Sequence, residues 1–202
     1  MSFTRQRIQA KGSFLRTLTA EELRREWKIE PEPGMLYVTV RAISSRVNAN
    51  YDGWPAPELE KAYASFVGRG VYPEHHNHDP QKSRGVILAS KLHKAHLADG
   101  SPDYWIEILE EIDATNYPKF AAGILSGEVK GTSMGADVGY TKCSVCGNKA
   151  SSPLEFCYHI AKMKGMMVVE SGKSQLVWED CYDIQFFENS HVVDPADESW
   201  IS

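Results

Sequence analysis

The sequence predicts an α+β fold whose core is a mixed or antiparallel, barrel-like sheet with flanking helices. Segments typical of strands outnumber those typical of helices by about two to one. The strands follow one another in runs instead of alternating with helices, which argues against a doubly wound parallel sheet. A length of 202 residues suits one compact domain that buries its core without disulfides.

Residues 1–34 are predicted to form an N-terminal lead-in segment with one short helix. Thr19 and Glu22 have the spacing of a capping box, in which the side chain of each residue satisfies a backbone amide of the other. Pro31 and Pro33 lie beyond that helix and end it. The remaining residues, 35–202, are expected to form the main domain.

Within the main domain, local patterns predict the order of the elements. Alternating β-branched and aromatic residues predict a first strand over 35–43. Pro57 opens a helix, because its missing N–H is not needed in the first turn. Gly127 closes another helix over 117–128. Further strands are predicted at 68–73, 84–92, 103–112 and 130–142, and one or two more within 176–193.

Composition narrows the range of functions. A hydrophobic fraction of 42% and a charged fraction of 24% are ordinary for a globular protein and exclude disorder of the whole chain. The net charge of −5 argues against a general nucleic-acid binder, which usually carries a basic field. No apolar run of about 18 residues occurs, so no membrane contact is expected. The first residues lack the apolar region of a secretory signal.

Three of the four cysteines are clustered, and a histidine follows them. In the C-x-x-C turn, Gly147 can adopt the positive φ angle that lets Cys143 and Cys146 face one metal ion. Cys157 and His159 are one residue apart, so on a strand or in a tight turn their side chains project the same way. Three sulfurs and one imidazole complete a tetrahedral set, which predicts a structural zinc ion without an open position for substrate.

The segment 141–162 is therefore expected to be a zinc-binding insertion. Two alternatives remain open for it. Cys143 and Cys146 could be a redox dithiol, although no thioredoxin-like context surrounds them, or the cysteines could be ordinary small core residues. Cys181 stands apart in a strand-like stretch and is predicted to be a core residue. Grouped, metal-ligating cysteines indicate a reducing compartment.

A second cluster contains His75, His76 and His78 beside Asp79. It has three interpretations. The histidines could form a second metal site, they could belong to a solvated polar loop, or one of them could act as a general base, since the pKa of histidine lies near neutral pH. The cluster alone does not choose among these.

Ser133 lies between a predicted helix and a predicted strand, with Gly131 and Gly135 close on either side. Glycines at these positions would let a substrate backbone approach. A serine is a nucleophile only beside a base and a place for an oxyanion. An ordinary strand serine is the alternative interpretation.

Five motifs occur in one order along the chain: NANYDGWP, EHHNHDP, TSMGAD, CSVCGN with FCYHI, and FFENSHVVDPAD. Together they resemble the prohead, or head maturation, serine proteases of tailed bacteriophages. The resemblance covers the chain from about Met35 to its end. Those proteases are similar in fold to the herpesvirus assembly proteases, which have a β-barrel core wrapped by helices. The resemblance implies a serine endopeptidase that digests the scaffold and trims capsid proteins inside the immature head.

The resemblance also implies roles for individual residues. Ser133 corresponds to the nucleophile, and His75 corresponds to the base in the EHxNxD pattern. His76 and His78 are alternative bases, because three histidines make the register of that motif ambiguous.

The third member of the triad is less directly implied. Glu188 matches the acid of the FFENSHVVDPA segment and would hold the tautomer of the histidine. His159 and His191 are rivals, because the herpesvirus proteases use a second histidine in this role. His159 is already assigned to the zinc site.

Residues 35–202 are accordingly expected to be a protease domain in which the zinc segment is inserted between core strands. Expected partners are the scaffold and major capsid proteins as substrates, together with self-association; nucleic acid and membranes are not expected. The expected location is the host cytoplasm and the interior of the assembling prohead. Two other functions stay open: a zinc-knuckle module that binds nucleic acid or a partner protein without catalysis, and a metal-dependent hydrolase that uses the histidine cluster.

Overall fold

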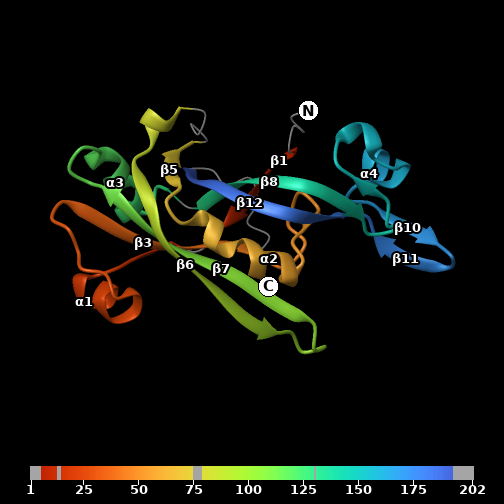
Figure 1. Cartoon of the computed structure of the whole chain (residues 1–202), viewed down its shortest axis with the longest axis horizontal. Helices are drawn as coiled ribbons and strands as arrows, with labels where there is room; N and C mark the ends of the chain where they lie inside the picture. The colour runs from red at the N-terminus through yellow and green to blue at the C-terminus, as the bar shows by residue number, and fades with distance from the viewer. Residues whose placement is uncertain (1–5, 13–14, 75–78, 130, 193–202) are drawn as a thin grey trace.

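The computed structural model describes residues 6–12, 15–74, 79–129 and 131–192, with side chains from residue 16 onward. One large sheet of ten strands dominates the molecule, and short helices lie along it (Figure 1). Its longer strands run in the order β1–β8–β12–β5–β6–β7–β3–β2, with β4 beside β12 and β9 beside β8. The strands are β1 (Gln6–Gly12), β2 (Leu15–Thr17), β3 (Met35–Ser44), β4 (Asp52–Gly53), β5 (Gly70–Pro73), β6 (Gly85–His96), β7 (Pro102–Asp113), β8 (Gly131–Cys143), β9 (Lys149–Ala150) and β12 (Glu179–Val192).

Two further strands form a separate hairpin at one end of the molecule (Figure 1). Four α-helices and four short helical turns complete the described part of the chain. The hairpin strands are β10 (Met167–Glu170) and β11 (Lys173–Leu176). The helices are α1 (Ala20–Glu22), α2 (Ala56–Ala62), α3 (Pro118–Ser126) and α4 (Tyr158–Met163), and the turns are η1 (Leu23–Trp27), η2 (Tyr63–Phe66), η3 (Pro80–Lys82) and η4 (Pro153–Glu155).

The large sheet is mostly antiparallel. Only the pairings of β12 with β4 and with β5 are parallel among the described strands. Glu110 on β7 bonds to Asn189 on β12 across the interior, although β5 and β6 separate these two strands in the sheet. The sheet therefore curls around its core. It does not close into a barrel, because β1 and β2 end the strand order without pairing with each other. The predicted α+β class with a mixed, mostly antiparallel sheet is confirmed.

The main core lies inside this curl. It is built from aliphatic residues of β3, β6, β7 and β8 and from three aromatic side chains. Phe66 stacks on Phe186 of β12 at a centroid distance of 4.0 Å, and Trp54 contacts the same ring at 6.3 Å. The Ser65 hydroxyl accepts a hydrogen bond from the Phe186 amide at 2.9 Å. Helix α2 and the turn after it are thus fastened to the middle of β12.

Local sequence signals predicted the bounds of several elements, but not the strands β1 and β2 in the segment 1–34, where only one short helix was expected. The capping box is present, with the Thr19 amide donating to Glu22 and the Glu22 amide donating to Thr19. The second helix begins within one residue of Pro57. Gly127 ends α3 with a left-handed φ of 74°. The segment 176–193, for which one or two strands were predicted, contains the end of β11 and the whole of β12.

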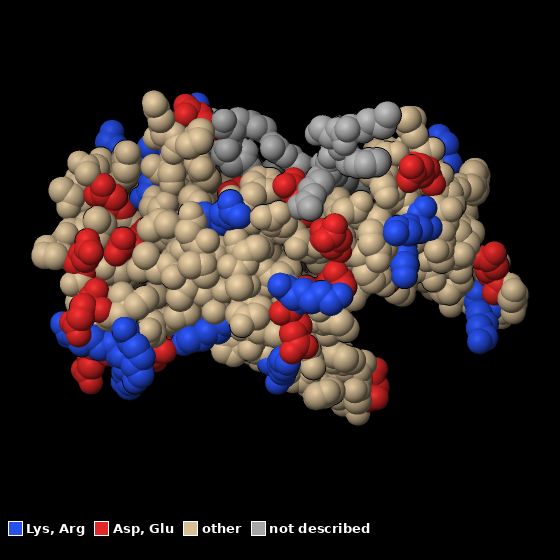
Figure 2. Space-filling model, in the orientation of Figure 1, with Lys and Arg blue, Asp and Glu red and all other residues tan. Residues whose placement is uncertain are grey.

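Charges of both signs are interspersed on the face that Figure 2 shows, where lysines and arginines stand in small groups among acidic residues. Within the part of the chain that the structure describes, no helix is long and apolar enough to cross a membrane.

Candidate functional site

The pairing of β8 with β12, which run antiparallel and side by side (Figure 1), creates the face that carries the predicted serine and acid. Ser133 on β8 lies directly opposite Ser190 on β12, and Glu188 lies opposite Gly135. Residues opposite each other in an antiparallel pair project from the same face. Ser133, Ser190 and Glu188 therefore share one face, and each of them is at most 2% exposed.

A β-bulge decides that Glu188 faces this way. The register between β12 and β8 shifts between Phe186 and Glu188, so Phe187 is an extra residue in β12. Before the bulge, Ile184 and Phe186 pack on the main core. After it, Asn189 takes the core side instead, since it bonds to a carboxylate inside the sheet. A bulge re-aims the side chains that follow it, and here it turns Glu188 onto the face of Ser133.

The carboxylate of Glu188 lies in space that is free because Gly135 has no side chain. The Ser190 hydroxyl donates to Glu188 Oε2 at 2.6 Å. Gly135 faces Glu188 from β8, and Gly70 faces it from β5. A Cβ atom on Gly135 would lie 2.5 Å from the Phe187 ring and 2.6 Å from Glu188 Oε1. A side chain on Gly135 is therefore incompatible with the present position of the acid.

Tyr72 on β5 lies opposite Ser190, and the charge of Glu188 affects its pKa. Burial raises the pKa of Tyr72, and the negative charges of Glu188 and Asp79 raise it further. The Glu74 amide donates to the carbonyl of His191 at 2.9 Å. Glu74, the last described residue before 79, therefore lies beside this end of β12.

The predicted base and its alternatives, His75, His76 and His78, lie outside the described residues. The assignment of the base therefore stays a prediction.

The rivals of Glu188 for the third position lie elsewhere. His191 projects from the opposite face of β12, where its Nε2 is 2.6 Å from Glu110 Oε2. His159 lies with the cysteines. Of these three residues, only Glu188 is brought to the face of Ser133. Sequence reasoning did not single out Ser190 as a neighbour of the acid, although an alternating E-x-S pattern on a strand is the signal that could have done so.

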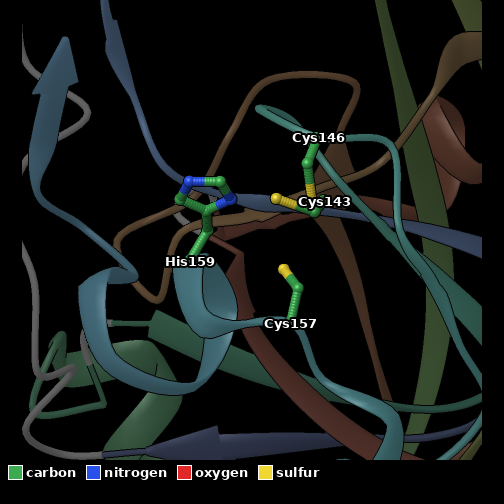
Figure 3. A group of neighbouring side chains, drawn as sticks. All are labelled: Cys143, Cys146, Cys157 and His159. Atoms are coloured by element: carbon green, nitrogen blue, oxygen red, sulfur yellow. The ribbon is translucent and has the colours of Figure 1, made fainter. Parts of the chain in front are cut away.

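A candidate metal centre lies at the other end of β8. The Sγ atoms of Cys143, Cys146 and Cys157 and a ring nitrogen of His159 lie within 4.8 Å of one another. Figure 3 shows the four side chains converging from β8, the turn after it and the start of α4. Cys157 is the residue before α4, and His159 lies in its first turn. The expectation that these two residues share a strand or tight turn is wrong, since a helix start brings them together.

The backbone around Gly147 holds Cys143 and Cys146 in a tight turn. Gly147 has a φ of +69°, and its amide donates to the carbonyl of Cys143 at 2.9 Å. The Val145 amide donates to Cys143 Sγ at 3.4 Å. Such a turn holds both thiols on one side, as a metal knuckle requires.

The thiols differ in acidity. Burial raises the pKa of the Cys143 thiol to about 11. Burial also raises the pKa of Cys157, but hydrogen bonds from the Ile160 amide and the neighbouring thiols outweigh it, so the net shift is downward. All the cysteines are free thiols.

This donor set fits a tetrahedral metal ion. A tetrahedron with metal–sulfur bonds of about 2.3 Å places its ligand atoms about 3.8 Å apart, within the spacing found here. The cluster can therefore hold a metal ion with all four positions filled by protein.

A small apolar cluster surrounds the metal centre. It includes Val168 of the β10–β11 hairpin and Val177, together with Ile160 and Cys143. We call residues 143–177, which contain the four ligands and this hairpin, the knuckle.

A lysine fastens the knuckle to the large sheet. Lys164 Nζ lies 2.6 Å from Asp52 Oδ1 and 2.6 Å from Glu179 Oε1, and both acids are 3% exposed. Gly165 follows with a φ of +84°, and its Cα packs so closely on the Tyr51 ring that a Cβ would lie 2.3 Å from it. Sequence reasoning missed this contact, because the lysine and Asp52 are 112 residues apart.

Burial and the ion pairs together shift the pKa values of Asp52 and Lys164. Burial raises the pKa of Asp52, although Lys164 opposes this shift. Burial lowers the pKa of Lys164, but the two carboxylates outweigh burial, so the net shift is upward. Lys164 thus stays charged to keep two buried carboxylates compensated.

Comparisons with known proteins add one likeness. No family model matches the chain, and no curated protein matches it either. Among solved structures, the chain is similar to the capsid assembly protease gp21 of bacteriophage T4, at 14% sequence identity. That likeness covers 95% of this chain and 99% of the T4 chain, with a TM-score of 0.48. A TM-score at this level does not establish a common fold.

Replacing Gly135 with alanine is expected to destabilise the protein by about 1–3 kcal/mol, because the new Cβ overpacks against Phe187 and Glu188. Chemical denaturation measures the change. Gly123→Ala on α3 is the control, since its Cβ would meet Val129 at an ordinary 3.5 Å and alanine favours the helix. Equal stability of the two variants would contradict the close packing over Gly135.

A metal ion bound by the four side chains is expected to stabilise the chain by about 4 kcal/mol under conditions where the free metal exceeds its dissociation constant about a thousandfold. Thermal unfolding with and without a chelator, together with metal analysis, measures this. Binding displaces protons from thiols, so the apparent affinity should fall as the pH falls. In Cys146→Ser, the chelator should have little further effect; a full chelator response there would remove Cys146 from the ligand set.

Replacing Lys164 with methionine is expected to cost about 3–5 kcal/mol at pH 7, because Asp52 and Glu179 lose their buried counter-ion. Lys162→Met, two residues earlier and exposed, is the matched control. Lys164 lowers the pKa of Asp52, so removing it raises that pKa further, and the folded variant binds protons more readily than the folded parent. Stability of the Lys164 variant should therefore improve relative to the parent as the pH falls from 7 toward 4, and a deficit independent of pH would speak against the ion pairs as its cause.

Proposed function

We propose that this chain is a serine endopeptidase that acts in the maturation of a phage prohead. The observation that carries the proposal is that Ser133, Ser190 and Glu188 share one face of the sheet. This placement agrees with the order of motifs in the chain, which resembles that of the head maturation proteases. The bulge at Phe187 and the bare Gly135 bring a buried acid to the face of the serine, although 55 positions separate Glu188 from Ser133 in the chain. A strand serine without a chemical role would not require this arrangement.

In the proposed reaction, Ser133 Oγ attacks the carbonyl carbon of the scissile peptide. Its proton passes to His75, or to His76 or His78 if the register of that motif differs. The imidazolium then gives the proton to the leaving amine as the acyl-enzyme forms, and water hydrolyses the ester by the same route. Glu188 orients the imidazole and stabilises its charged form.

The choice of Ser133 over Ser190 has a physical reason. The Ser190 hydroxyl already donates its proton to Glu188 at 2.6 Å, so it serves to hold the acid. A nucleophile must instead give its proton to a base of suitable pKa. Ser190 is therefore a partner of Glu188.

Further parts of the proposal follow from the motif resemblance. Residues 35–202 form the protease domain, preceded by a lead-in segment at 1–34, and 141–162 is its zinc-binding insertion. The ion at Cys143, Cys146, Cys157 and His159 is a structural zinc that stabilises the fold and takes no part in the reaction, because its four positions are filled by protein. The substrates are scaffold and major capsid proteins, the chain associates with itself, and its site of action is the host cytoplasm and the interior of the assembling prohead.

A second candidate function is binding through the knuckle without catalysis. The observation in its favour is a group of exposed apolar side chains there, of which Leu154 is 97% and Val169 is 76% exposed. Exposed apolar groups of this kind are typical of interaction surfaces. This function requires neither Ser133 nor Glu188, so the experiment below separates it from proteolysis.

Ser133→Ala is expected to abolish cleavage when the chain is co-expressed with its cognate scaffold and capsid proteins, because the acyl-enzyme cannot form. Gel analysis of the capsid proteins measures cleavage, and thermal unfolding and metal content verify that the variant is folded. Ser190→Ala is the matched variant on the opposite strand. It loses one hydrogen bond to the acid and should keep cleavage, slowed by about tenfold.

Persistent scaffold cleavage by Ser133→Ala would falsify the assignment of the nucleophile. Cleavage lost only in Ser190→Ala would transfer that role to Ser190. No cleavage by the unaltered chain, with normal binding to its partners, would favour the knuckle as the functional element.

A further inference from the structure

Glu110 is a carboxylate inside the main apolar core. It lies on β7 between Ile108 and Ile112, whose side chains belong to that core, and it is 0% exposed. Burying an ionised group is strongly unfavourable unless hydrogen bonds compensate it. A side chain retained in such a place therefore has close partners.

Both oxygens of Glu110 meet side chains of β12. Oε1 accepts a hydrogen bond from Asn189 Nδ2 at 2.7 Å, and Oε2 lies 2.6 Å from His191 Nε2. An ionised carboxylate only accepts, so an amide and a ring N–H are suitable donors. Within the described residues, Glu110 is the polar partner of both side chains, and the remaining Asn189 Oδ1 and His191 Nδ1 have none. Phe120 packs its ring edge-on against His191 at 5.4 Å.

The residues that meet Glu110 alternate with the residues of the proposed site. Glu188 and Ser190 face Ser133, whereas Asn189 and His191 face the core. Because side chains alternate along a strand, a slip of one residue would exchange the two sets. Hydrophobic patterning cannot prevent this slip, since all of residues 188–191 are polar and the bulge at Phe187 interrupts the pattern of the preceding residues.

We propose that Glu110 is a positioning residue that locks the register of β12. Its carboxylate is the polar partner of Asn189 and His191 on the core side of β12, and it thereby holds Glu188 and Ser190 on the face of Ser133. In the slipped register, Asn189 and His191 would face Ser133, and Glu188 would enter the core beside Glu110. The catalytic consequence rests on the proposed function, while the register lock does not.

A disulfide trap measures the register without catalysis. Ser133→Cys and Ser190→Cys place two thiols directly opposite each other, at a Cβ separation of about 4.5–5.5 Å that a disulfide can close with a small adjustment. The rate of cross-linking under mild oxidation is compared with and without Glu110→Leu. Loss of the lock is expected to slow cross-linking by about tenfold, because residue 190 then spends most of its time on the other face.

Two further variants separate the lock from a general loss of stability. Glu110→Gln should keep the rate within about twofold, since the Asn189 amide can turn its oxygen toward the new NH₂ group while the other oxygen still accepts from His191. Glu111→Gln is the matched control: it is the next residue on β7, and its carboxylate accepts from the Tyr37 hydroxyl at 2.7 Å on the other side of the strand. It should leave the rate unchanged.

Kinetics on a cleavable capsid substrate test the catalytic consequence. With both serines in place, Glu110→Leu is expected to lower kcat by about tenfold, because Glu188 then faces Ser133 in only about a tenth of the molecules. KM should stay within about twofold, because Glu188 acts in the transition state and not in substrate binding. Combined with Glu188→Gln, Glu110→Leu should cost little more than Glu188→Gln alone, since it acts through the acid.

The outcomes are distinct. An undiminished cross-linking rate in folded Glu110→Leu overturns the register lock, and additive losses in the double variant overturn the action through Glu188. If the unaltered chain cleaves nothing, the proposed function fails, and the cross-linking rates still decide the lock. If Glu110→Leu does not fold, Asn189→Asp takes its place, because it sets a second carboxylate against Glu110. Adding Glu110→Gln should then restore cross-linking, and failure to do so overturns the pairing.

Discussion

The antiparallel pairing of β8 with β12 positions both candidate sites of this protein. One end of this pair carries Ser133, Ser190 and Glu188, and the other end leads into the cysteine knuckle. The pair is not regular, because the bulge at Phe187 changes which side chains of β12 face inward. Upstream of the bulge, apolar residues fill the core, and downstream of it the core side is polar. The same strand thus contributes to packing in its first part and to the site in its last part.

Buried polar side chains at both ends of β12 contact residues that lie far from them in the sequence. Lys164 bridges Asp52 and Glu179 near its start, and Glu110 meets His191 near its end. These contacts are expensive to form, since each buried charge loses its hydration. These contacts contribute to the specificity of the fold, because a buried polar group is stable only in an arrangement that provides its hydrogen-bond partners. At both ends of β12, the buried polar groups that favour this arrangement have their partners on other elements.

The fold was predictable where local physical chemistry decides it. The capping box at Thr19, the proline near the start of α2 and the glycine after α3 act within a few residues, so their signals are visible in the sequence. The four candidate metal ligands were predictable as a set, because the chemistry of thiols and imidazole restricts their use. The geometry of Cys157 and His159 was not, since a helix start and a tight turn both bring neighbouring side chains together.

Local patterns in the sequence predicted the class of the fold, many of its strands and helices, and the cysteine and histidine donors, while the motif resemblance singled out Ser133 and Glu188. The strands β1, β2 and β10 were not predicted. The three-dimensional arrangement was needed to place Ser133 and Glu188 on one face and His191 on the other, and to show that the described strands β1 and β2 do not pair with each other. The physical reason is that alternation along a strand defines two faces but does not say which one is inside. That choice depends on a one-residue bulge and on partners 81 residues away along the chain, and neither leaves a local pattern in the sequence.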